Sequence, residues 1–149
     1  MKIDDEIKGR FRNEYHRGII NLTYTLNQLN YQFLQLLKKH NVTQQQYNVL
    51  KVLRGFRSEA PVSIGFIKDR MLDKNSDVSR IVDKLYERGL VTRCEKSTDR
   101  RQKDVDISDK GLDLLAAMDD CEKKVDTLLS NLTEDEVKQL NTLLDKIRG

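Results

Sequence analysis

The sequence predicts a mainly α-helical (α+β) chain with one short β-hairpin, and two observations predict this class. Apolar side chains recur at three- and four-residue steps over most of the 149 residues, which is the spacing of amphipathic helices. Only residues 90–107 change to β-branched content and to alternation of apolar and polar side chains. The composition agrees, because proline breaks helices and the chain has only one.

The first predicted helix is long. From Ile7 to Leu36 apolar residues hold one face of a helix over about eight turns. Most helices of globular proteins are much shorter. We therefore expect this helix to take part in a helix–helix interface.

Two shorter helices follow. Thr43 and Gln46 have the spacing of a capping box, and the helix that they begin should end near Gly55. Residues 58–61 are expected to form a loop. Ser63 is then the expected N-cap of a second, short helix.

A further helix is expected from Ser76 to Arg88, and a hairpin should follow it. Gly89 is expected to end the helix in the left-handed conformation. Residues 90–94 have the β-branched content of a strand, and residues 95–103 are polar and charged, so we expect a loop there. Residues 104–107 alternate polar and apolar side chains, which predicts a second strand with one buried face.

The C-terminal part is expected to be helical. Ser108 is the expected cap of one helix that reaches Leu132. Thr133 and Glu136 form a second capping box, which predicts a last helix.

The middle of the chain therefore has the element order of a winged helix-turn-helix, a fold that binds duplex DNA. A major groove admits one α-helix that presents short polar and cationic side chains from its first turns. The residues that we expect to contact DNA from this helix and the turn before it are Lys74, Asn75, Ser76, Asp77, Ser79, Arg80 and Lys84.

The tip of the hairpin is the second predicted contact. A guanidinium suits the narrow minor groove, so we expect Arg101 to enter it, oriented by Asp99. Arg100 and Lys103, like Lys74, suit contacts with phosphates. Two plainer interpretations stay open: a surface ion pair between Asp99 and Arg101, and a merely solvated polar helix face.

The charge distribution supports a polyanionic partner. Net charge is +5 over residues 1–67, +4 over residues 68–103 and −6 over residues 104–149. This asymmetry indicates that one side of the protein faces a polyanion and the other does not.

The sequence resembles the MarR (multiple antibiotic resistance) regulators. The run from Ser76 to Val91, then Arg93, residues 99–101 and residues 105–111, is similar to the family's recognition helix, its Asp-x-Arg wing and the start of its C-terminal helices. The resemblance implies a homodimer, with a helical dimerisation domain from residues 1–40 and 108–149 and a DNA-binding lobe from residues 41–107. It also implies a ligand pocket, for which the candidate lining residues are Tyr15, Tyr47 and Val49.

We expect a dimeric DNA-binding transcription regulator, a repressor that a small-molecule inducer or a stress signal releases. Its partner would be a pseudo-palindromic double-stranded operator with half-sites about 10 base pairs apart. Two alternatives stay open: a protein-interaction module, and a thiol-based redox regulator that uses Cys94, near Arg93 and Lys96. The family's peroxide sensors use an N-terminal cysteine, and residues 15–22 contain none.

No enzyme, cofactor or metal chemistry is expected. The sequence has no phosphate-binding glycine motif and no Ser/His/Asp or Cys/His arrangement. His16 and His40 lie far apart with no cysteine near either of them. No apolar run approaches the roughly 20 residues of a membrane span, and the N-terminus lacks a signal-peptide core. We therefore expect a cytoplasmic protein without a membrane partner.

Overall fold

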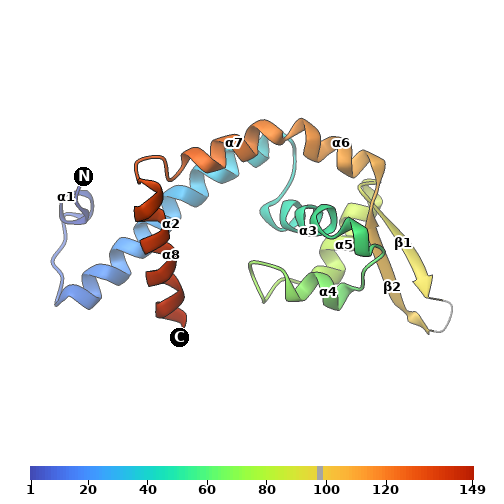
Figure 1. Ribbon diagram of the computed structural model, residues 1–149, viewed down its shortest axis with the longest axis horizontal. Helices are drawn as coiled ribbons and strands as arrows, with labels where there is room; N and C mark the ends of the chain where they lie inside the picture. The colour runs from blue at the N-terminus through green and yellow to red at the C-terminus, as the bar shows by residue number, and fades with distance from the viewer. Residues whose placement is uncertain (97–98) are drawn as a thin grey trace. The chain divides into compact units, whose positions relative to one another are not determined.

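The computed structural model describes residues 1–96 and 99–149, but not the side chains of residues 95–96, 99–103 and 121. The chain forms two compact units, residues 1–36 and residues 37–149. The elements (Figure 1) are α1 (Ile3–Ile7), α2 (Glu14–Lys38), α3 (Gln44–Gly55), the 3₁₀ helix η1 (Arg57–Glu59), α4 (Ile64–Asp69), α5 (Val78–Glu87), β1 (Val91–Lys96), β2 (Asp99–Ile107), α6 (Asp109–Ala117), α7 (Asp119–Thr127) and α8 (Glu134–Arg148).

The expected first helix begins later than its apolar pattern suggests. Lys8 has a φ of 56°, which ends α1, and α2 starts only at Glu14. Asn13 accepts a hydrogen bond from the His16 amide at 2.9 Å, which satisfies a free N–H at the start of α2. Apolar spacing alone gave no sign of this break, because Ile7 keeps the four-residue step with Phe11.

Two polar contacts hold α1 against α2. Arg17 pairs with Asp4 at 3.0 Å, and the Tyr24 hydroxyl donates to Glu6 at 3.0 Å. The side chain of Ile3 is buried. The accepting carboxylate of Glu6 also raises the pKa of Tyr24 above its ordinary value.

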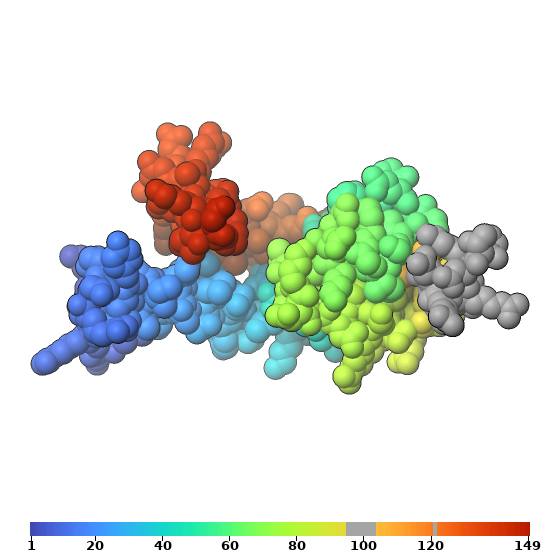
Figure 2. Space-filling model, turned by 90° about the horizontal axis from the view of Figure 1, so that it is seen from below, coloured from blue at the N-terminus to red at the C-terminus, as the bar shows by residue number. Residues whose placement is uncertain are grey.

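The core of residues 37–149 lies between α3, α4, α5, the hairpin and α6. Figure 2 shows the green and yellow-green residues of α4 and α5 as one continuous surface. The fully buried side chains of this core include Leu50, Leu53, Ile67, Leu85, Val91, Val105 and Leu115. Burial of these side chains on elements from α3 to α6 joins the helices and the hairpin into one folded body.

The predicted helix caps are confirmed. Each cap side chain accepts a hydrogen bond from the backbone N–H three residues later, and two of the caps are complete capping boxes. The four caps are Thr43, Ser63, Ser108 and Thr133. Each fixes the first turn of its helix, so local sequence sets where these helices begin.

The hairpin is longer than expected. β1 and β2 are antiparallel, with Val91 opposite Ile107 and Glu95 opposite Lys103, and the register shifts after Glu95. The prediction of a loop over residues 95–103 is therefore wrong, since strand backbone reaches Lys96 and resumes at Asp99. Ladder hydrogen bonds join backbone groups, and so a polar sequence without alternation can still form them.

Val62 pairs with the outer edge of β2. Its amide donates to the Val105 carbonyl at 2.9 Å, and the Val105 amide donates back at 2.7 Å. This bridge ties the segment before α4 to the hairpin, and both valines are buried.

The expected helix over residues 108–132 is divided into α6 and α7. The break lies at Met118, whose side chain is buried and whose amide bonds back to Leu115 at 3.0 Å. Glu122 of α7 accepts hydrogen bonds from Lys51 and, at 2.8 Å, from Arg54. Both cations belong to α3, so these ion pairs join α7 to α3.

A search of the helices in residues 1–96 and 99–149 finds none with the length and apolarity that a bilayer span requires.

Candidate nucleic-acid interface

Helix α5 separates an apolar face from a polar one. Its buried side chains are Val78, Ile81, Val82 and Leu85. The residues predicted to contact DNA that are exposed on α5 or in the turn before it are Lys74, Asn75, Asp77, Ser79, Arg80 and Lys84. A helix docked by one face and polar on the other is the form that a DNA-reading helix requires.

The start of α5 is fixed by Asp77. Its carboxylate accepts a hydrogen bond from the Arg80 amide at 3.3 Å, so Asp77 acts as the N-cap. Lys74 donates to the backbone carbonyl of Asp69. These two predicted contact residues therefore already have partners within the turn that they stabilise.

Ser76 differs from its neighbours. Only 5% of its surface is exposed, and its hydroxyl is buried without a hydrogen-bond partner within the described part of the chain. Its amide bonds to the Asp73 carbonyl at 3.2 Å. The structure therefore places Ser76 under the turn, whereas Asn75 and Asp77 on either side of it are exposed.

A hollow lies between α5 and the N-terminus of α3. It has a volume of about 300 Å³, and Arg80 and Lys84 line it together with Gln45 and Gln46. Gln46 is held in place by the Arg88 guanidinium, which donates to its side-chain oxygen at 3.2 Å. The Asp77 carboxylate also lines the hollow, but two cationic side chains and the partial positive charge of the helix N-terminus outnumber it, so the surface keeps a positive balance. The sequence analysis missed Gln45, because the capping box explained this segment without a second role.

The predicted tip residues are only partly described. The backbone of Asp99, Arg100, Arg101 and Lys103 belongs to β2. Their side chains lie outside the residues whose side chains the structure describes. Their roles at the minor groove and at phosphates therefore stay predictions.

Arg93 of β1 links the hairpin to α5, a connection that the sequence analysis did not find. Its guanidinium donates to Asp83 at 2.6 Å and lies 4.0 Å from the centroid of the Tyr86 ring. The contact forms because the chain turns sharply at Gly89, whose φ is 73°. As a result, Arg93 lies close to Asp83, although ten positions separate them in the sequence.

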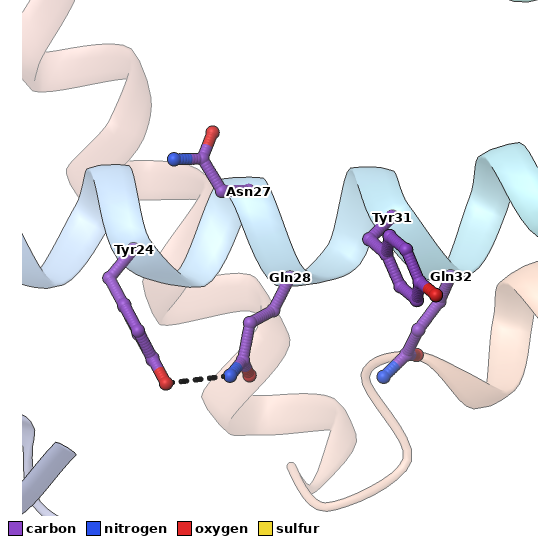
Figure 3. A pocket seen from close by; sticks show the side chains of 5 residues that line it. All are labelled: Tyr24, Asn27, Gln28, Tyr31 and Gln32. Carbon is purple, nitrogen blue, oxygen red and sulfur yellow. Dashed lines mark hydrogen bonds between the residues drawn. The ribbon is translucent and has the colours of Figure 1, made fainter.

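The three candidate ligand-pocket residues belong to different units. Tyr15 is 89% exposed in residues 1–36, whereas Tyr47 and Val49 are buried in residues 37–149. Helix α2 carries a hollow of its own, with a volume of about 500 Å³ (Figure 3). The residues that line it are Tyr24, Asn27, Gln28, Tyr31 and Gln32.

The lining of this α2 hollow mixes aromatic and amide groups. Gln28 donates to the Tyr24 hydroxyl at 2.8 Å, and Figure 3 shows both side chains on the same side of the helix. Tyr24 and Tyr31 are not among the pocket residues that we expected from the sequence. The amides recur at helical spacing beside them, which is the signal that could have identified this polar strip.

Two observations concern metal and thiol chemistry. Among the described residues, no group of three or more His, Cys, Asp and Glu side chains could hold a metal ion. Cys94 is a free, exposed cysteine on β1. The side chain of Cys121 is not described.

Comparisons with known proteins agree on one family. The sequence model of the MarR family matches residues 42–103. The transcriptional regulator MgrA of Staphylococcus aureus is 28% identical over 113 residues, which cover 76% of this chain and 74% of MgrA.

Solved structures share the fold. The MepR–DNA complex of Staphylococcus aureus aligns with a TM-score of 0.72 at 22% identity and covers 84% of this chain and 94% of MepR. The structure of Bordetella bronchiseptica BpsR, whose DNA binding is regulated by 6-hydroxynicotinic acid, aligns with a TM-score of 0.68 at 18% identity and covers 87% and 99% of the two chains. At these identities the two structures show a common fold.

Proposed function

Since the chain belongs to the MarR family of winged-helix, DNA-binding transcription regulators, we propose that it is a homodimeric repressor that a small molecule releases from its operator. The operator would be a pseudo-palindrome read by two copies of α5 in successive major grooves, about 10 base pairs apart. The two wings would reach the flanking minor grooves. Arg101 would enter the groove, and Asp99 would orient the guanidinium of Arg101.

The exposed face of α5 is the observation that carries this proposal. Arg80 and Lys84 are exposed beside the hollow at the α3 N-terminus. They make no ion pair with the side chains that the structure describes, so both are available to a polyanion. The MepR–DNA complex supports the same use of this fold.

Exposed apolar side chains support a dimer. Patches of this kind mark interaction surfaces in soluble proteins. On α2 the exposed apolar side chains include Tyr15, Ile19, Leu22, Leu26, Tyr31 and Leu34, and on α8 they are Leu143 and Ile147. None of the residues of α8 is buried in the single chain. We propose that residues 1–40 and 108–149 bury these surfaces against a second copy.

A structural relative and the hollow on α2 support regulation by a ligand. BpsR, a structural relative, responds to 6-hydroxynicotinic acid. Tyr15, Tyr47 and Val49 remain our candidates for a pocket completed by the dimer, and Tyr24 and Gln28 are added by the α2 hollow. A ligand would act by stabilising a dimer whose lobe spacing no longer matches two successive grooves.

Footprinting on the DNA upstream of the protein's own coding region tests the proposal, and Arg80→Ala and Arg101→Ala test its interface. We expect a two-fold symmetric footprint, and weaker binding for both variants, by about tenfold or more for a lost bidentate contact. Arg57→Ala is the control, because Arg57 is an exposed cation on η1 and lies outside both the proposed dimer segments and the predicted DNA contacts. Binding of Arg80→Ala and Arg101→Ala as tight as wild type would refute the interface. No binding to any duplex would favour a protein-interaction module.

A thiol-based response is the second candidate, because Cys94 is free and exposed on β1. It predicts that a peroxide lowers operator affinity in the wild type and leaves Cys94→Ser unaffected. Equal responses of the two proteins would exclude this use of Cys94.

A further inference from the structure

We propose that Arg93 is a positioning residue that braces the wing against helix α5 and neutralises an acidic side chain on the surface that meets DNA. The proposal rests on the proposed DNA-binding function. It adds a residue that neither the recognition helix nor the wing tip contains. Arg93 acts through Asp83 and Tyr86, without touching DNA itself.

The contacts of Arg93 are specific. Its Nη1 donates to Asp83 Oδ1 at 2.6 Å, and its guanidinium carbon lies 4.0 Å from the centroid of the Tyr86 ring. The side chain of Arg93 is 21% exposed, whereas that of Asp83 is 59% exposed. The guanidinium is thus largely covered, and the carboxylate that it pairs with remains at the surface.

Asp83 lies where a carboxylate opposes DNA binding. It comes three residues after Arg80 and directly before Lys84, so it shares the exposed side of α5 with the cations that we expect to enter the major groove. An unpaired carboxylate among phosphates repels them, and this repulsion weakens the complex. Pairing with Arg93 cancels that charge before DNA arrives.

The position of Arg93 also fixes the wing. Gly89 ends α5, and the Leu90 amide bonds back to the Leu85 carbonyl at 3.0 Å, so β1 starts directly beside the helix. Arg93 is the third residue of β1 and reaches back over the last turn of α5. A contact at this point resists rotation of the hairpin about its base, which sets where its tip meets the duplex.

An arginine suits both tasks. Its planar guanidinium can donate to a carboxylate by one edge while its face lies on an aromatic ring. A lysine keeps the charge but has no planar group for the ring. Arg93→Lys should therefore retain the neutralisation of Asp83 and lose the stacking on Tyr86.

A double-mutant cycle on operator affinity tests the proposal with Arg93→Ala, Asp83→Asn and the double variant. We expect Arg93→Ala to weaken binding about tenfold in the wild-type background, equivalent to about 1.4 kcal/mol. In the Asp83→Asn background the loss should fall below about threefold, because no carboxylate is left unpaired. Equal losses in the two backgrounds overturn the proposal. Arg57→Ala combined with Asp83→Asn forms the control cycle, since Arg57 is an exposed cation on η1, outside the proposed dimer and DNA contacts, and its effect should be the same in both backgrounds.

The salt dependence separates a brace from a direct phosphate contact. If Arg93 bound a phosphate, its removal from both protomers would lower the magnitude of the slope of log K against log salt by about 1.8, and the affinity loss would persist in the Asp83→Asn background. We expect instead that the slopes of Asp83→Asn and of the double variant agree. A difference of about 1.8 between the two slopes overturns the proposal. Arg93→Lys should bind with an affinity between those of wild type and Arg93→Ala.

Failure of the proposed function is recognised separately. If the wild-type protein binds no duplex, the regulator assignment fails, and the brace is then tested by amide hydrogen exchange without DNA. We expect Arg93→Ala to speed exchange at residues 91–94 and 104–107 of the hairpin, while exchange in α8 stays unchanged. Unchanged exchange in the hairpin overturns the brace.

Discussion

The substitution Gly111→Ala tests how closely α6 packs on the base of the wing. Gly111 is the third residue of α6, and a Cβ atom there would lie 2.3 Å from the Leu90 carbonyl oxygen and 2.7 Å from Ile107 Cγ1. Non-bonded heavy atoms prefer separations of about 3.5 to 4.0 Å. The added methyl group is therefore more than about 1 Å too close to a backbone atom that cannot rotate away.

The helix has little freedom to retreat. The Ser108 amide donates to the same Leu90 carbonyl at 3.0 Å, and the Ser108 hydroxyl donates to the Gly89 carbonyl at 2.6 Å. Moving α6 outward stretches both bonds. Overpacking of this kind costs about 1 to 3 kcal/mol, and alanine's helix preference over glycine returns up to about 1 kcal/mol. Because the contact is with backbone, we expect the upper end of that range and a net loss of about 2 kcal/mol.

Urea denaturation followed by circular dichroism measures this loss. Gly65→Ala is the matched control, since the nearest atom to its added Cβ is Ser63 Oγ at 3.9 Å. The control should be as stable as wild type, or more stable by up to about 1 kcal/mol. If Gly111→Ala matched wild type while the control behaved as expected, the packing of α6 on the wing base would be refuted.

Three further predictions concern caps, core and assembly. Thr133→Ala should lower the free energy of unfolding by about 1 kcal/mol, measured by urea denaturation. The substitution removes the hydrogen bond that the Glu136 amide donates to the Thr133 hydroxyl in the α8 capping box. The hydrogen bonds from Thr133, first of all from its backbone amide, lower the pKa of Glu136 below its ordinary 4.5, so the stabilisation that Glu136 provides is present above pH 4.5 and is lost as pH falls through the lowered value. A loss of α8 protection on acidification, absent in Glu136→Gln, checks this, and a gain would contradict it. Leu85→Ala should cost about 2 to 5 kcal/mol and weaken DNA binding through unfolding, since Leu85 has no exposed surface; a variant that stays as stable as wild type would contradict the core assignment. Removal of residues 1–30 should abolish the dimer in sedimentation, and a stable dimer from that truncated chain would exclude our interface.

Features that depend on neighbouring residues were predictable from the sequence. The caps at Thr43, Ser63, Ser108 and Thr133 are bonds between a side chain and backbone three residues away. The left-handed turn at Gly89 needs only the freedom of a glycine. The buried and exposed faces of α5 follow from helical spacing, and so the exposed cations Arg80 and Lys84 could be named in advance.

Features that depend on backbone geometry or distant partners were not predictable. Apolar spacing continues across the helix breaks at Lys8 and Met118, and it hides them even though Gly9 and Asn13 follow Lys8. The ends of β1 and β2 depend on ladder bonds that polar side chains do not reveal. The burial of Ser76 and the pairing of Arg93 with Asp83 both require the fold, because each depends on how a turn folds back.

The salt dependence of binding to the protein's own upstream DNA tests the central claim most directly. Each protomer offers three predicted phosphate contacts, Lys74, Arg100 and Lys103, so a dimer offers six. For six neutralised phosphates the slope of log K against log salt should be about −5. A saturable complex with a slope near that value is the result that we predict. A slope near zero, or no saturable binding at low salt, would contradict the assignment of this chain as a DNA-binding regulator.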